Sequence, residues 1–318
     1  MELIVRNYLS SLELGDMLVF GNMATIPLFI KADMEPDYIT LDEALQHHLS
    51  QITEISESGS VPELKVINHA DMPLLLIDGE ELLGARQNRI LNATILVKER
   101  AETVIPVSCC EQGRWHHTSR NFSTSPHIMP CFLRQAKVGD VTTSLRSKKG
   151  YRSNQARVWD QLRESALRFN VDSPTGAMKD LFDAKEEELH ESLKALEIKP
   201  EQKGVLIFIN GEVAGLDIVS RGSAYMTLHP KLIKSYAIES LEKRRMRTKP
   251  SVEKARAFLA EAAHCVEEKY PSIGYGWNYR YEGERVVGAA LVYQDRVIHA
   301  SFFRTRRIDS NGLSDFQT

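Results

Sequence analysis

The amino-acid sequence predicts an α+β fold made largely of antiparallel sheets with hairpins. β-rich runs separated by turn residues fill the first 130 positions and the C-terminus, and amphipathic helices concentrate in the middle and the C-terminal half. The regular strand-helix alternation of a parallel sheet is not visible. The 318 residues are 42% hydrophobic and 26% charged, which excludes a largely disordered chain and allows a sizeable core.

The N-terminal β region begins with a strand between Val19 and Ile30. A short helix follows at Thr40, because Thr40 and Glu43 have the spacing of a capping box. Apolar runs then continue to Cys110, and the turn pair Asp78-Gly79 predicts a hairpin between two of them.

Apolar residues recur at spacings of three and four in the C-terminal half, which predicts helices. The predicted helices span Trp159–Phe169, Met178–Leu196, His229–Met246 and Val252–Tyr270. A C-terminal hairpin turns at Gln294–Arg296. The segment VLIFINGEVAGLD has the residue order of LLLIDGEELLGA, which indicates either a weak internal duplication or two hairpins with the same turn chemistry.

These patterns divide the chain into three parts. Residues 1–135 form a β-rich half that carries the candidate site, and residues 156–318 form an α+β half that packs with the first or separately. Between them, residues 136–155 are expected to be a basic connecting loop, because basic residues dominate there without hydrophobic periodicity.

The charge balance limits the partners. With 40 basic and 43 acidic residues the net charge is −3, so we expect neither nucleic acid nor an anionic membrane as partner. The basic stretch Lys148–Arg157 is the alternative contact for nucleic-acid phosphates, although such a stretch is more often a surface loop. Apolar runs are too short to span a bilayer, no secretory signal is visible and the four cysteines form no disulfide framework, so we expect a cytoplasmic protein.

Two clusters of polar residues interrupt the predicted strands. One is GEELLGARQNRILN, residues 79–92, and the other is CCEQGRWHH, residues 109–117. An arginine buried near a strand is costly unless a carboxylate or a bound anion satisfies it. Arg86 or Arg89 therefore either pairs with Glu111 or Glu80 as a structural bridge or faces an anionic ligand.

These clusters resemble the ARG and rhodanese-phosphatase-superfamily-associated protein domain family, whose pattern runs GEEL, small residues, QNR, N, then PVSC, one residue and EQGRW. The resemblance continues more loosely through VLIFINGEVAGLD and YEGERVVGAALVYQDRVIHASFF. The family name implies a place in NAD or ADP-ribose-linked metabolism, with other proteins of ADP-ribose metabolism as partners. The positions that match the motifs are Glu80, Gln87, Asn88, Arg89, Cys109, Glu111, Gln112, Arg114 and Trp115.

An ADP-ribose-like nucleotide is the ligand that this resemblance suggests. Arg89 and Arg114 are expected to bind its phosphates, and Trp115 to stack on its base. Gln87 and Asn88 are expected to bond ribose hydroxyls. Gln112 completes this ligand-binding set.

Hydrolysis is the simplest reaction for such a ligand, although whether the chain is an enzyme stays open. Glu111 is the expected general base if burial raises its pKa, and Glu80 is the alternative carboxylate. The alternative function is a non-catalytic module that binds a ligand or a partner protein, with the polar residues as a structural network.

The thiols offer a rival chemistry. Cys109 with His116 as its base is an alternative nucleophile, but buried, inert thiols explain the cysteine pair more simply. We expect no metal and no other cofactor. Zinc is the alternative, because suitable ligand types are present without the usual spacing of a cysteine pair, namely Cys109, Cys110, His116, His117 and Cys131.

Overall fold

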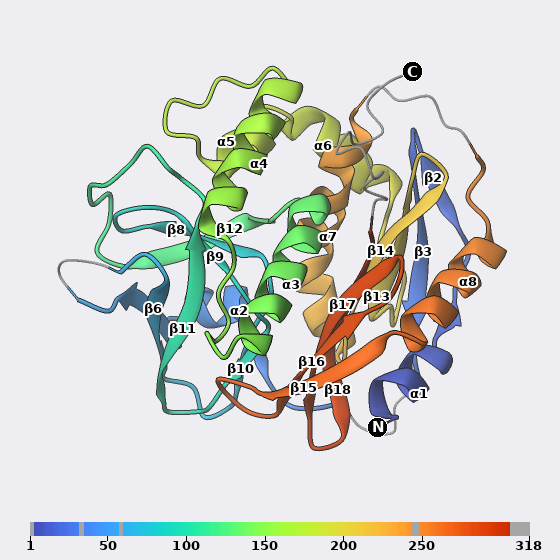
Figure 1. The fold of residues 1–318 in the computed structure, drawn as a ribbon, viewed down its shortest axis with the longest axis horizontal. Coiled ribbons are helices and arrows are strands. Elements are labelled where there is room, and N and C mark those ends of the chain that lie inside the picture. Colours follow the sequence, from blue (N-terminus) through green and yellow to red (C-terminus); the bar gives the residue numbers. More distant parts are fainter. Residues whose placement is uncertain (1–2, 32–34, 57–59, 243–247, 306–318) are drawn as a thin grey trace.

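A computed structural model describes residues 3–31, 35–56, 60–242 and 248–305 of the chain. Helices and largely antiparallel sheets confirm the predicted α+β class (Figure 1). No helix in these ranges is both long enough and apolar enough to cross a membrane.

The main sheet is antiparallel and joins the two ends of the chain. Its strand order is β1-β3-β13-β14-β18-β17-β16-β15, with β2 paired to β3. The pairing of β3 with β13 therefore crosses the expected boundary at residue 135. The strands are β1 (Glu13–Leu14), β2 (Leu18–Phe20), β3 (Met23–Phe29), β13 (Gly204–Ile209), β14 (Glu212–Val219), β15 (Val266–Pro271), β16 (Trp277–Glu282), β17 (Val286–Tyr293) and β18 (Arg296–Arg304).

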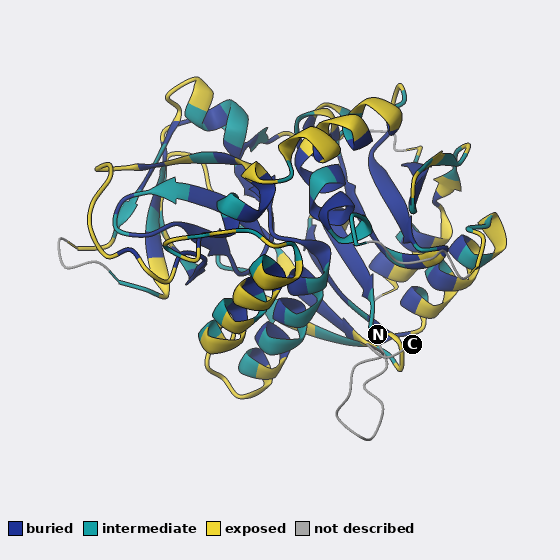
Figure 2. Cartoon of the chain, turned by 90° about the horizontal axis from the view of Figure 1, so that it is seen from above, coloured by how far each residue is buried: buried dark blue, intermediate teal, exposed yellow. Residues whose placement is uncertain are grey.

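Helices cover both faces of this sheet. Helices α1 (Ile4–Ser10) and α8 (Val252–Ala263) lie on one face, and α3 (Cys131–Arg146) and α7 (Gly222–Ser240) lie on the other (Figure 1). Successive side chains of a strand point to opposite faces, so a strand covered on both sides is apolar throughout. All six residues of β13 are accordingly buried. Figure 2 shows strands in the interior of the molecule in the colour of buried residues.

Two smaller sheets form the other side of the molecule. The six-stranded sheet has the order β12-β8-β9-β11-β6-β5, and the three-stranded sheet has the order β10-β7-β4. Helix α2 (Leu41–Gln46) packs beside them and begins with the predicted capping box of Thr40 and Glu43. The strands are β4 (Ile39–Thr40), β5 (Ser50–Glu54), β6 (Glu63–Asn68), β7 (Leu74–Leu76), β8 (Glu80–Gly84), β9 (Arg89–Leu91), β10 (Ile95–Val97), β11 (Glu102–Cys109) and β12 (Phe122–Ile128).

The predicted connecting loop over residues 136–155 is wrong for its first part, since α3 continues to Arg146. The buried face of α3 carries Arg134 and Lys137, whose charges are paired with Asp217 and Asp78. Charged residues on the buried face hid the hydrophobic periodicity.

Two predicted helices also have other bounds. Residues 178–196 form α5 (Met178–Asp183) and α6 (Glu186–Ala195) rather than one helix, and α4 (Gln155–Arg168) precedes them. The helix predicted to reach Tyr270 ends at Ala263 and is followed by β15, because Val266 and Tyr270 continue the four-residue spacing of Phe258 and Ala262 but pair as a strand.

The predicted helix over residues 229–246 corresponds to α7, which begins earlier, at Gly222. Residues 243–246 of that prediction lie outside the described residues.

The turn at Asp78-Gly79 does not close a hairpin. Strand β7 pairs with β10 and β4, whereas β8 pairs with β9 and β12, so the turn connects two sheets. The similar segment around Gly211 does close a hairpin, between β13 and β14. The C-terminal hairpin of β17 and β18 is confirmed.

Candidate functional site

The two polar clusters lie side by side at one end of the six-stranded sheet. Strand β9 pairs with β11 so that Arg89 lies opposite Cys109, and the Cys110 amide donates to the Asn88 carbonyl at 3.1 Å. Residues after β11 therefore contact the loop between β8 and β9.

A buried ion pair between Glu111 and Arg114 connects these segments. Arg114 Nη2 lies 2.6 Å from Glu111 Oε2, which also accepts the Asn88 amide at 3.0 Å. The other carboxylate oxygen accepts from Thr175 Oγ1 at 3.0 Å. Both oxygens of Glu111 are thus held by protein donors.

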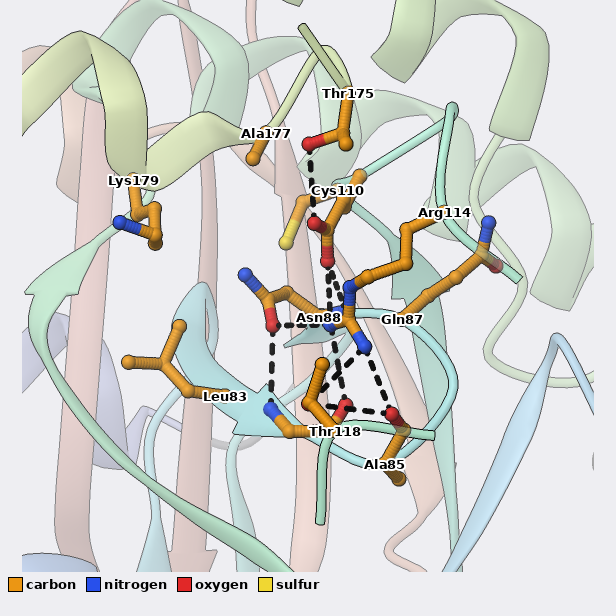
Figure 3. A network of polar contacts seen from close by, with 12 residues as sticks. Leu83, Ala85, Gln87, Asn88, Cys110, Arg114, Thr118, Thr175, Ala177 and Lys179 are labelled. Carbon is orange, nitrogen blue, oxygen red and sulfur yellow. Dashed lines mark hydrogen bonds and ion pairs between the residues drawn. The ribbon is translucent and has the colours of Figure 1, made fainter. Parts of the chain in front are cut away.

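Arg114 also donates to the loop after β8. Its Nη1 donates to the Ala85 carbonyl at 2.8 Å, and its Nη2 donates to Asn88 Oδ1 at 3.0 Å (Figure 3). Thr118 Oγ1 accepts a further bond at 3.2 Å. The guanidinium therefore joins the two loops instead of facing a phosphate.

The electrostatics of Glu111 differ from what a general base requires. Burial alone would raise the pKa of Glu111, but hydrogen bonds from Arg114 and the Asn88 amide, with the positive charge of Arg114, hold this pKa below its ordinary value. Glu111 is consequently an ionised but weak base at neutral pH.

Arg89 is fully buried beneath the same loop. Its Nη1 donates to the carbonyl and to Oε1 of Gln87, each at 3.2 Å, and Glu54 is the paired carboxylate at 3.9 Å. Nε and Nη2 of Arg89 have no hydrogen-bond partner among the described residues. Arg89 and Arg114 meet at Asn88, but Arg89 presents no surface to solvent.

The remaining predicted ligand contacts differ in exposure. Gln87 and Asn88 are buried, whereas Gln112 is exposed and Trp115 is 48% exposed. The guanidinium carbon of Arg86 lies 5.6 Å from the centre of the Trp115 ring system. The accessible part of the cluster thus includes an indole with a neighbouring cation.

Glu80 belongs to a different environment, at the start of β8. Its Oε1 lies 3.2 Å from Lys231 Nζ, which also contacts Asp42 at 2.6 Å. Burial raises the pKa of Glu80 despite the Lys231 charge. The structure does not bring Glu80 into the network of Glu111.

The thiols point into the protein. Cys109 and Cys110 are fully buried, and burial raises the pKa of both thiols. Cys109 Sγ contacts Gln87 Oε1 at 3.2 Å, while His116 is exposed. In the described ranges no three His, Cys, Asp or Glu side chains are positioned to hold a metal ion, so the zinc alternative has no ligand cluster there.

Sequence reasoning missed a second polar group beside this site. Ser125 Oγ donates to Glu81 Oε2 at 2.7 Å, and His127 Nδ1 lies 3.2 Å from the same hydroxyl. A carboxylate only accepts, so the serine proton goes to Glu81 and the hydroxyl can accept from Nδ1. His127 also stacks on Phe182 with a centroid distance of 4.3 Å. The i, i+2 spacing of Ser125 and His127, which places two side chains on one face of a strand, was the available signal.

The comparisons with known proteins identify the family alone. No curated protein matches the chain, and no solved structure matches it. The model of the ARG and rhodanese-phosphatase-superfamily-associated protein domain matches residues 11–303, which include both polar clusters and the three sheets except for the last residue of β18. The chain therefore belongs to this family.

Proposed function

We propose that this protein binds an ADP-ribose-related or NAD-related nucleotide at the loops of residues 84–88 and 112–118. The family name gives the ADP-ribose context. The observation that carries the proposal is that Trp115 stays 48% exposed directly beside Arg114, whose side chain is fixed by the buried network. An exposed indole beside a fixed arginine is suited to stacking on a base.

In this proposal the buried motif residues shape the surface instead of touching the ligand. Arg114 and Glu111 hold the two loops together, and Arg86 beside Trp115 supplies a cation for the nucleotide. The lowered pKa of Glu111 favours a binding protein over hydrolysis by this carboxylate.

Titration calorimetry with NAD, ADP-ribose, AMP and adenosine tests the proposal. Base–aromatic stacking contributes about 1–3 kcal/mol, so Trp115→Ala should weaken binding by roughly five- to 150-fold. Trp277→Ala is the matched control, because Trp277 is 45% exposed and has Lys269 Nζ at 4.5 Å from its ring centre. Absence of binding across the panel, or equal losses in the two variants, would contradict the proposal.

Chromatography of the same mixtures tests the hydrolase alternative. A bound nucleotide that is consumed by the wild type, and is bound but not consumed by Glu111→Gln, would make Glu111 the base. A nucleotide that stays intact supports the binding protein.

A further inference from the structure

A polar cavity of about 590 Å³ lies beside α3, away from the loops around Trp115. Its walls come from the C-terminal half of α3, the segment 149–154 that returns to α4, and the end of β16 (Figure 1). This volume falls within the range of about 300–1,000 Å³ that small-molecule sites have. The cavity can therefore hold a ligand of ordinary metabolite size.

Both carboxylates that line the cavity are paired with arginines, whereas two of the lining cations are not paired with a described side chain. Arg157 pairs with Asp140 at 2.7 Å, and Glu282 pairs with Arg146 at 2.5 Å. The other two charged lining residues, Lys149 and Arg152, have no side-chain partner among the described residues. Two cations consequently remain for a ligand after the carboxylates are neutralised.

A further positive charge lies behind this wall. Arg280 is only 1% exposed, and its Nε and Nη2 have no hydrogen-bond partner in the described parts of the chain. Its guanidinium carbon lies 5.6 Å from the ring centre of Tyr151, which stands between the lining residues Lys149 and Arg152. Buried charge is weakly screened, so Arg280 adds to the positive potential of the cavity.

A hydroxyl and an amide in the lining, from Ser147 and Asn154, supply neutral hydrogen-bond donors. The hydroxyls of Thr143 and Ser144 also line the cavity, but they donate to the carbonyls of Gly139 and Gly150 at 3.0 and 2.8 Å. Hydroxyls and cations together are the groups that bind phosphate oxygens in proteins.

The cavity wall is attached to the strand that leads into the family motif. Ser153 Oγ lies 2.5 Å from Ser108 Oγ. Gln155 makes two bonds to the backbone of Cys109, each of 2.8 Å. This attachment fixes the segment 149–154 although its tip is exposed.

We propose that this cavity binds the phosphate groups of a small phosphorylated molecule, with Lys149 and Arg152 as the residues that contact the phosphates. The site is separate from the loops around Trp115, and its ligand need not be the nucleotide proposed above. The net charge of the whole chain does not indicate this phosphate site, because the excess of cations is confined to the cavity.

Calorimetry with inorganic pyrophosphate and with ADP tests this site. The double variant Lys149→Gln/Arg152→Gln should weaken binding of both probes at least tenfold and leave the unfolding temperature unchanged, because neither side chain has a protein partner. Lys148→Gln is the control, since Lys148 is exposed and does not line the cavity. Tighter binding of ADP than of pyrophosphate would indicate that the ligand of the cavity is a nucleotide. Equal binding of the two probes would indicate that the cavity recognises only the phosphate groups.

Two outcomes would overturn the proposal. The first is that neither probe binds the wild type, whether or not a single-stranded oligonucleotide binds. The second is that Lys148→Gln weakens binding as much as the double variant does. Trp115→Ala should leave pyrophosphate binding unchanged. A failure of the proposal for the loops around Trp115 can therefore be distinguished from a failure of the proposal for this cavity.

Discussion

Arg134 and Asp217 form a bidentate ion pair between α3 and β14, and both side chains are excluded from solvent. The two bonds measure 2.9 and 2.5 Å, and the Tyr236 hydroxyl donates to Asp217 Oδ2 at 2.8 Å. Burial alone would raise the pKa of Asp217, but the Arg134 charge and the hydrogen bonds lower it to about 2. The pair thus fixes α3 to the main sheet with a carboxylate that must stay ionised.

Acid should destabilise the protein partly through Asp217. A folded-state pKa of about 2, below the ordinary 3.8, means stabilisation that is present above pH 3.8 and lost as the pH falls through 2. The shift corresponds to about 2 kcal/mol at neutral pH. Urea unfolding of wild type and Asp217→Asn between pH 2 and 7 should give a smaller pH dependence for the variant. Equal pH dependence would contradict this role.

The Glu111–Arg114 pair should contribute strongly to stability. Arg114→Met leaves a buried carboxylate without its cation, and such losses cost about 3–5 kcal/mol. Glu111→Gln should cost less, because an amide oxygen still accepts the Asn88 N–H. Chemical denaturation of the two variants and the wild type measures both losses in the free energy of unfolding.

An exposed ion pair of the same spacing provides the control. Asp160 and Arg163 are also three residues apart, with side chains 57% and 63% exposed. Arg163→Met should change the free energy of unfolding by less than about 1 kcal/mol. A similar loss for Arg114→Met and Arg163→Met would show that the buried network is dispensable.

Local signals in the sequence were enough to predict several secondary-structure elements. The capping box at Thr40 and the hairpin between β17 and β18 follow from neighbouring residues, and both are present. The expectation that Arg89 and Arg114 bind one ligand required the two polar clusters to meet, and the pairing of β9 with β11 brings them together.

Long-range partners explain what the sequence could not predict. Helix α3 has a buried face with Arg134 and Lys137, and only the fold brings Asp217 and Asp78 to them. In the same way, the pKa of Glu111 depends on Thr175, which lies 64 positions away, as well as on the nearby Arg114. The direction of that shift was therefore not available from the sequence.

Thiol labelling should find Cys109 and Cys110 unreactive in the folded protein. Both are fully buried and burial raises the pKa of each thiol, so little thiolate meets the reagent. Mass spectrometry after treatment with an aromatic disulfide at pH 8 measures this site by site, and urea-unfolded protein is the control for complete labelling. Rapid native labelling of Cys109 would instead support the nucleophile hypothesis.

The hairpin turn at Gly211 should tolerate no side chain. Its φ is +83°, and an added Cβ would lie 1.8 Å from the Thr248 carbonyl oxygen, so Gly211→Ala must displace backbone as well as adopt a left-handed conformation. Gly21 has a φ of +55° with nothing within 4 Å of the added Cβ, so Gly21→Ala incurs only the conformational cost of about 1–2 kcal/mol. Overpacking adds about 1–3 kcal/mol, and Gly211→Ala should therefore be the less stable variant by at least about 1 kcal/mol in urea unfolding. Equal stability of the two variants would mean that the segment at Thr248 moves away without cost.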